Sequence, residues 1–307
     1  MLSGGAPSPS TSVKILITGS TGLLGQALSA RLAPSCNLTT LSRHAATPMP
    51  GVRHLVADLA DPEQAVRAIR DAQPDLILHA QALSDVDRCE REPASAQAQN
   101  VLPVIHLRQA LASDQRALLV SISTDYVFDG TKGEAYDERD MPRPLSVYGA
   151  SKRSGEEEAL RRARAMVVRT GTLFGLGRPT FCEYVAAQVR VGQPVEAFVD
   201  QWTSPTFTKD VADAVAELSF RRWQSADGQW PRVVHVTNAG GCSRVEFARR
   251  IATLTGGDPE LVRAVPMASQ RRPAARPANS MLSSIHVPTL LGRSLRTWDD
   301  ALCAHLR

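Results

Sequence analysis

The sequence contains no long apolar run. Its longest purely apolar stretches have four or five residues, as in Ala117–Val120, whereas a helix that spans a membrane needs about 20. We therefore expect no membrane segment. The first twelve residues have no basic start and no apolar central stretch, so they do not resemble a signal peptide. Their serine, proline and glycine content predicts a disordered tail over residues 1–12.

Cysteine and net charge are also low. The five cysteines form no CxxC pair and no cysteine and histidine spacing typical of metal ligands. We therefore expect neither a disulfide framework nor a bound metal, and a reduced cytoplasmic protein fits this composition. A net charge of +4 over 307 residues, with no long basic block, gives no indication of nucleic-acid binding.

Short apolar runs and helical patterns alternate over the first 170 residues. Because the predicted strands are apolar on both faces, we expect an α/β fold with a parallel sheet covered by helices. The predicted strands are 13–18, 37–42, 54–57, 75–79, 118–123, 166–169, 195–199 and 233–237. The predicted helices are 23–32, 62–71, 96–113, 151–164, 210–220 and 244–254.

A glycine-rich turn joins the first strand to the first helix. Gly19, Gly22 and Gly25 recur at intervals of three residues. Glycines at such a turn let the backbone approach a diphosphate, and the helix N-terminus supplies free N–H groups. The position of the turn predicts a dinucleotide site in a Rossmann-like, doubly wound parallel sheet. The alternative is a turn whose glycines only permit close packing.

The end of the second strand bears on the choice of cofactor. It carries Ser42 and Arg43 and lacks the acid that would bind the ribose 2′-hydroxyl of NAD. A serine and an arginine suit a 2′-phosphate, so NADPH is favoured, while NADH stays open and Arg43 could simply be solvated. Asp58, after the third strand, is placed equally well to approach the adenine or to cap a turn.

A tyrosine and a lysine four residues apart are candidates for proton transfer. Tyr148 and Lys152 would lie on one face of a helix. An ammonium beside a phenol is expected to lower the tyrosine pKa from about 10, which allows proton exchange with a carbonyl oxygen. Thr124, at the end of the fifth strand, can bond to the same oxygen. This pattern occurs widely by chance, but after a dinucleotide turn it predicts Thr124, Tyr148 and Lys152 as catalytic.

These motifs together resemble the extended short-chain dehydrogenases/reductases, and within them the dTDP-4-dehydrorhamnose reductase family. The resemblance covers about residues 13–285, and STDYVFDG at 123–130 is its most discriminating segment. Sugar-nucleotide dehydratases of the superfamily usually place an acid pair after the threonine, whereas here Asp125 is followed by Tyr126. The other segments that carry the resemblance are 22–25, 82–87, Asn100, 148–156 and 276–280.

The resemblance implies a reaction and a set of cofactor contacts. Thr124 and Tyr148 would hold a substrate carbonyl, Tyr148 would protonate it, and Lys152 would bind the nicotinamide ribose. Hydride from NADPH would reduce a 4-keto group on a nucleotide-linked deoxysugar. The expected cofactor-binding residues are Gly19, Thr21, Gly22, Leu23, Leu24, Gly25, Ser42, Arg43, Asp58, Leu59, Ala80, Ala82, Leu83, Ser84, Asn100, Ile122, Tyr148 and Lys152.

The substrate side departs from the family pattern. The family usually has a tryptophan that contacts the sugar where this chain has Thr172, and the loop 175–180 is short with a Gly-Arg-Pro sequence. Trp202 could supply a substitute aromatic face, or equally be a packing residue. Guanidinium groups match phosphate oxygens, so Arg271, Arg272 and Arg276 are candidates for the substrate diphosphate, with a solvated basic loop as the alternative. The predicted substrate site comprises Thr124, Asp125, Tyr148, Thr172, Trp202, Arg271 and Arg276.

We expect two parts in the chain. Residues 13–170, rejoined by 207–238, would form the Rossmann part, and residues 171–206 and 239–307 a smaller C-terminal substrate-binding lobe. The cleft between them would hold NADPH and a nucleotide sugar. A homodimer is compatible with the sequence, which does not indicate one.

Two other functions share these motifs. A non-catalytic NADP-binding regulatory subunit, similar to the methionine adenosyltransferase β-subunit, also fits the Gly-Leu-Leu-Gly turn. A nucleotide-sugar epimerase would retain NAD and consume no net cofactor.

Overall fold

The computed structural model describes residues 13–225 and 230–307, so the tail predicted over residues 1–12 lies outside the described residues. A seven-stranded sheet forms the centre, in the order β11-β6-β5-β4-β1-β2-β3, and every neighbouring pair is parallel. The predicted doubly wound parallel sheet is therefore confirmed. Its strands are β1 (Lys14–Thr18), β2 (Asn37–Ser42), β3 (Arg53–Val56), β4 (Leu76–His79), β5 (Leu118–Thr124), β6 (Ala165–Thr170) and β11 (Val233–His235).

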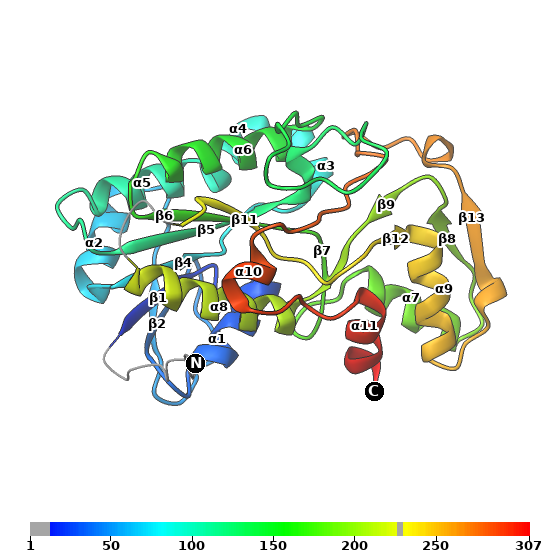
Figure 1. Ribbon diagram of the computed structural model, residues 1–307, viewed down its shortest axis with the longest axis horizontal. Helices are drawn as coiled ribbons and strands as arrows, with labels where there is room; N and C mark the ends of the chain where they lie inside the picture. The colour runs from blue at the N-terminus through cyan, green and yellow to red at the C-terminus, as the bar shows by residue number, and fades with distance from the viewer. Residues whose placement is uncertain (1–12, 226–229) are drawn as a thin grey trace.

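Helices cover both faces of this sheet (Figure 1). On one face α1 (Leu23–Leu32) packs against α8 (Thr208–Gln224), which also contacts α10 (Val287–Leu291). On the other face α5 (Leu102–Ala110) packs between α2 (Pro62–Ala72) and α6 (Val147–Leu160). The short helices α3 (Val86–Arg91) and α4 (Pro93–Asn100) contact α6.

The two-sided burial explains why the strands carry apolar residues on both faces. Successive side chains of a strand point to opposite faces. Ile15 and Ile17 accordingly belong to the core on the α1 side, whereas Leu16 between them belongs to the core on the α2 side. The strands are therefore mainly apolar on both faces, as a sheet covered by helices requires, and their polar side chains are buried as well.

A smaller group of elements packs beside the carboxyl ends of the sheet strands. Its helices are α7 (Phe181–Arg190), α9 (Arg244–Leu254) and α11 (Trp298–Leu306). Its core includes the stacked rings of Phe174 and Phe207, with Phe247 beside them. Three strand pairs complete it: β8 (Val195–Phe198) with β13 (Val262–Val265), β7 (Thr172–Phe174) with β10 (Pro205–Phe207), and β9 (Trp202–Thr203) with β12 (Cys242–Ser243). The single-turn helices are η1 (Asp125–Val127), η2 (Pro259–Leu261) and η3 (Met267–Ser269).

The segment 207–238 connects the two parts. Its strand β11 pairs with β6 at the edge of the main sheet, and its helix α8 packs against α1. These contacts support our proposal that this segment belongs with the Rossmann part. The assignment of 171–206 and 239–307 to a substrate-binding lobe stays a prediction, and α10 within it packs on α8 of the Rossmann part.

Three predicted helices differ from the structure. The helix predicted over 210–220 is α8, which extends over residues 208–224. The helix predicted over 151–164 is α6, which begins at Val147 because the Ser146 hydroxyl accepts a hydrogen bond from the Gly149 amide. Tyr148 consequently lies in the helix rather than before it. The helix predicted over 96–113 is divided into α4 and α5, and Pro103 lies in the first turn of the second. No helix among the described residues is long and apolar enough to cross a membrane.

Candidate active site

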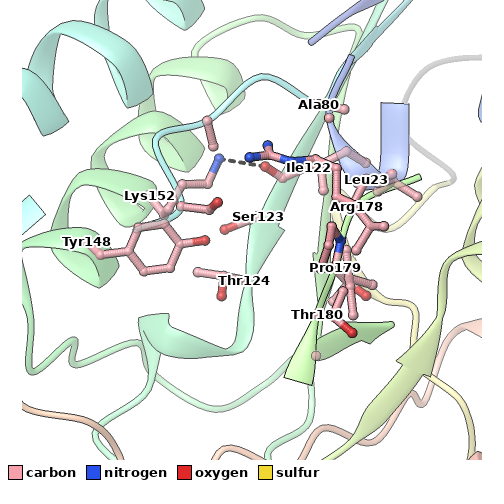
Figure 2. Close-up of a pocket in the computed structure, with 17 residues that line it drawn as sticks. Leu23, Ala80, Ile122, Ser123, Thr124, Tyr148, Lys152, Arg178, Pro179 and Thr180 are labelled. Carbon is pink, nitrogen blue, oxygen red and sulfur yellow. Dashed lines mark hydrogen bonds between the residues drawn. The ribbon is translucent and has the colours of Figure 1, made fainter. Parts of the chain in front are cut away.

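A cavity of about 430 Å³ lies at the carboxyl ends of the central strands. This edge of a doubly wound sheet is where ligands bind, at the point where the strand order reverses between β1 and β4. Figure 2 shows the side chains of β5 and α6 on one side of the cavity and those of α1 and the loop 175–180 on the other. The lining residues are Gly22, Leu23, Leu24, Ala80, Ala82, Ser84, Ile122, Ser123, Thr124, Tyr148, Lys152, Thr170, Gly171, Leu173, Arg178, Pro179 and Thr180.

Two glycines, one in the turn before α1 and one in the first turn of α1, leave no room for a side chain. Gly19 has a φ of +70°, and a Cβ there would lie 2.6 Å from the Gln81 backbone. A Cβ on Gly25 would lie 2.2 Å from the Gly19 carbonyl oxygen. Helix α1 begins after Gly22 with no side chain capping its amides and no acid in its first turn. Its first N–H groups are therefore free of side-chain partners beside the cavity that Gly22, Leu23 and Leu24 line, which is the usual arrangement of an anion site.

The three predicted catalytic side chains meet in this cavity. Thr124 is the last residue of β5, Tyr148 lies in the first turn of α6, and Lys152 lies one turn further on. The Thr124 hydroxyl donates to the Asp125 carboxylate at 2.9 Å, and the Lys152 ammonium donates to the Ile122 carbonyl oxygen at 2.7 Å. Figure 2 shows the hydroxyl groups of Thr124 and Tyr148 on the cavity side of their elements.

Burial sets the ionisation of this group. It raises the pKa of Tyr148, and the hydrogen bond with Thr124 only partly offsets that rise. Burial also lowers the pKa of Lys152 to about 8, against the opposing effect of the Glu156 charge. The expectation that Lys152 lowers the tyrosine pKa is therefore wrong for this structure, because desolvation of the phenol dominates. Tyr148 holds its proton at neutral pH, as a proton donor must.

Asn100 does not line the cavity, but its buried side chain joins two segments that do. Its buried side chain accepts from the Leu83 amide at 2.7 Å and donates to the Leu83 carbonyl at 3.2 Å. The same amide group donates to the Ser151 hydroxyl at 2.9 Å. Asn100 thus ties the loop after β4 to the helix that carries Tyr148 and Lys152.

A buried ion pair behind the site was not predicted. Glu156 accepts two hydrogen bonds from Arg169, each of 2.8 Å, and one from the Ser123 hydroxyl at 2.6 Å. Although burial raises the pKa of Glu156, these partners hold it below the ordinary value. The pair joins β5, β6 and α6, which are separated in sequence, so only the folded chain reveals it.

His79, at the end of β4, is a second buried group that the sequence did not single out. Its ring bonds to the Thr18 hydroxyl at 2.7 Å. Burial and the nearby charge of Lys152 lower the pKa of His79 to about 3, so the ring is neutral.

Several predicted cofactor residues lie away from the cavity wall. The Ser42 hydroxyl donates to the His44 carbonyl at 2.6 Å, and Arg43 beside it is exposed. The Asp58 carboxylate accepts from the Ala60 amide at 2.9 Å, which is the turn arrangement considered for it. Leu59 is fully buried, and Thr21 lines a separate hollow beside β2. Their contact with a cofactor stays a prediction.

The predicted substrate residues are only partly brought together. Thr124, Tyr148 and Asp125 are adjacent, and burial raises the Asp125 pKa to about 6 against hydrogen bonds from Ser280 and Thr124. Thr172 instead bonds to Thr203 at 2.6 Å, and Trp202 is 40% exposed on β9. Neither side chain lines the cavity.

The three arginines proposed for the substrate diphosphate also lie outside the cavity wall. Arg276 binds the Asp87 carboxylate through two hydrogen bonds of 2.8 and 2.9 Å, which neutralises its charge. Arg271 and Arg272 are exposed. By contrast the loop 175–180, which the sequence marked only as unusual, supplies Arg178, Pro179 and Thr180 to the cavity.

Comparison with known proteins extends the similarity over the whole fold. A family model described as RmlD substrate binding domain matches residues 13–307. A dTDP-4-dehydrorhamnose reductase from Streptomyces griseus is 34% identical over 96% of this chain and 93% of its own. A probable low-salt glycan biosynthesis reductase from Haloferax volcanii is 32% identical over 94% and 95%. The crystal structure of dTDP-4-dehydrorhamnose reductase from Bacillus anthracis, in complex with NADP, is 27% identical and superposes with a TM-score of 0.82 over 95% and 97% of the two chains.

Proposed function

The chain belongs to the RmlD substrate binding domain family, and on that premise we propose that it is an NADPH-dependent reductase of a 4-keto group on a nucleotide-linked deoxysugar. The observation that carries the proposal is the single cavity that Thr124, Tyr148 and Lys152 share with the glycine turn. Proton donor and diphosphate turn thus lie within reach of one dinucleotide and one carbonyl substrate. The name of the Bacillus anthracis relative and its complex with NADP support the choice of substrate class and cofactor.

The residues of the chain have distinct tasks in this reaction. Bound NADPH supplies the hydride that becomes attached to the carbonyl carbon. Thr124 and Tyr148 hold the carbonyl oxygen by hydrogen bonds, and the Tyr148 phenol gives that oxygen its proton, so the ketone becomes a secondary alcohol. Lys152 keeps a cation in the cavity while the tyrosine carries the resulting negative charge. Buried Asn100 and Glu156 hold the elements that position these groups.

We assign the cofactor to the residues around the turn. Gly22, Leu23 and Leu24 lie at its diphosphate, and Ala80, Ala82, Ser84 and Ile122 line the groove that leads to Lys152. The remaining predicted contacts, from Gly19 to Asn100, are proposed on the family resemblance. Asp125, Thr172 and Trp202 are proposed for the sugar side on the same basis.

The test is a reductase assay with a matched pair of variants. Wild-type protein should oxidise NADPH when a dTDP-4-keto-6-deoxysugar is added. Tyr148→Phe should lower kcat by about 10²–10⁴-fold, which is the range for a lost general acid. Tyr184→Phe alters an exposed tyrosine of α7 and should leave kcat unchanged. Absence of NADPH oxidation with every keto sugar tried would remove the proposal.

The alternatives predict other results in the same assay. A regulatory subunit would bind NADP without turnover and would retain an enzyme partner in stoichiometric amount. An epimerase would convert the sugar with no net cofactor consumption. Mass spectrometry of the cofactor that co-purifies with the protein separates the epimerase from the reductase.

The cellular setting is also a proposal. All five cysteines are free thiols, which suits a reducing cytoplasm.

A homodimer stays a prediction. Light scattering during size-exclusion chromatography would measure the oligomeric state.

A further inference from the structure

The cavity has an unbalanced charge. Among the described residues that line it, Lys152 and Arg178 are cationic and none is an aspartate or glutamate. Lys152 is buried near the Glu156 charge, whereas the Arg178 side chain is exposed at the rim of the cavity. Two cations on the wall with no carboxylate among the lining side chains attract an anion. The cationic side chains of the wall therefore favour an anion in the cavity, as does the uncapped N-terminus of α1.

Arg178 is an exposed cation without a carboxylate partner in the part of the chain that the structure describes, and unlike the exposed Arg271 it lines the cavity. Arg276, by contrast, is neutralised by Asp87. Figure 2 shows Arg178 extending from its loop into the cavity that Leu23, Ile122 and Lys152 also line. A guanidinium presents a planar fork of donors that matches phosphate oxygens, so its position beside the glycine turn has a clear chemical use.

The loop that carries Arg178 is fixed at both ends. Gly177 has a φ of +111°, and a Cβ there would lie 2.4 Å from the Gln26 side chain of α1. Gln26 in turn donates to the Thr21 carbonyl at 3.0 Å, within the diphosphate turn. On the other side Thr180 begins α7 through reciprocal capping with Glu183. Arg178 is thus held between the first turn of α1 and the start of α7.

We propose that Arg178 binds the diphosphate of the dinucleotide cofactor, on the same side of the cavity as the α1 amides. This inference rests on the proposed cofactor but not on the identity of the sugar. A nucleotide-sugar substrate carries a diphosphate of the same chemistry. The cofactor is favoured because the loop of Arg178 packs on α1 itself, beside Gly22, Leu23 and Leu24 of the same wall.

The test measures dissociation constants by titration calorimetry for Arg178→Gln and Arg178→Lys, with Arg190→Gln as the matched control. Arg190 is an exposed arginine of α7 that does not line the cavity. Loss of a charge-assisted phosphate contact should weaken NADP⁺ binding by about tenfold or more in Arg178→Gln, by less in Arg178→Lys, and not in Arg190→Gln. The salt dependence of NADP⁺ binding should decrease together with the affinity.

Three probes identify the phosphate involved. If Arg178 contacts the diphosphate, NAD⁺ and NADP⁺ should lose affinity by the same factor, and dTDP should bind as it does to the wild type. A loss confined to NADP⁺ would assign Arg178 to the 2′-phosphate, and a loss confined to dTDP would assign it to the substrate; either result overturns the inference. Unchanged affinity for all three probes overturns it as well.

These outcomes are separate from the failure of the proposed reductase activity. Wild-type protein that binds NADP⁺ but reduces no keto sugar would contradict the proposed function and leave the role of Arg178 intact. Wild-type protein that binds neither NAD⁺ nor NADP⁺ would contradict both. Equal melting temperatures of the variants would exclude misfolding as the cause of a lost affinity.

Discussion

Burial, more than charge proximity, decides what Tyr148 and Lys152 can do. A phenol removed from water keeps its proton, while an ammonium in the same surroundings loses part of its preference for being charged. The sequence pattern predicted which residues meet but gave the wrong direction for the tyrosine pKa. Spacing along a helix contains no information about how much water reaches the site.

Lys152 is required for the proposed reaction, but its buried charge should reduce the stability of the folded protein. Burial lowers its pKa from 10.5 to about 8, so the folded chain binds fewer protons than the unfolded chain between these values. Stability therefore rises with pH across that window, and the buried ammonium is unfavourable at neutral pH. We expect Lys152→Met to raise the free energy of unfolding by about 1–2 kcal/mol, which is the gain from removing the buried charge less the cost of the hydrogen bond to Ile122 that is lost. The same substitution should abolish turnover. Urea denaturation at neutral pH measures this, and a less stable variant would contradict it.

Cofactor affinity should follow the same ionisation. With a pKa of about 8, Lys152 is mostly charged at neutral pH and loses its charge as the pH rises through that value. NADPH binding, which loses a charged hydrogen-bond donor at the nicotinamide ribose, should therefore weaken between about pH 7 and pH 9. Calorimetric titration across that range checks the trend. Lys152→Met should bind weakly at every pH, and an equally steep profile in that variant would assign the titration to another group.

At the scale of elements, patterns in short segments of the sequence predicted the helices and strands that form through interactions within those segments. The strands and the glycine turn were found because apolar runs and glycine spacing are properties of short segments. The start of α6 was missed because it depends on the Ser146 hydroxyl. A single capping residue is a weaker sequence signal for a helix than a repeated apolar pattern. The pairing of Arg276 with Asp87 was missed because it joins segments that only the fold brings together.

The first turn of α1 should not accept a methyl group at Gly25. Gly25→Ala would place a Cβ 2.2 Å from the Gly19 carbonyl, so the turn or the helix must shift. We expect NADP⁺ affinity to fall by at least about tenfold, because the α1 amides would no longer meet the diphosphate.

The control for this change is another glycine. Gly133→Ala adds a methyl group where no atom lies within 4 Å and should leave NADP⁺ binding unchanged. Tight NADP⁺ binding by Gly25→Ala would show that the turn does not approach the cofactor.

At the scale of the whole molecule, the chain passes repeatedly between the sheet and the smaller lobe. Because β7 and β10 of the lobe lead directly into or out of elements of the Rossmann part, we expect the two parts to unfold together. The sequence anticipated this interleaving from the pattern at 207–238. It did not anticipate α7 or α11, whose burial against Phe174 and Phe247 depends on distant partners.

A cavity made in the lobe should therefore destabilise the entire protein. Leu302 of α11 is fully buried, so Leu302→Ala should lower the free energy of unfolding by about 2–4 kcal/mol. Scanning calorimetry should record one transition at a lower temperature than in the wild type. Two separate transitions, with only one of them shifted, would show that the lobe unfolds independently of the Rossmann part.

The most direct test of the central claim follows the hydrogen atom itself. NADPH that carries deuterium at the transferable position of the nicotinamide should give, with a dTDP-4-keto-6-deoxysugar, an alcohol that contains one deuterium at C4. Wild-type protein should form this product, and Tyr148→Phe should form almost none. An alcohol without deuterium, or equal product from both proteins, would contradict hydride transfer from the cofactor with protonation by Tyr148.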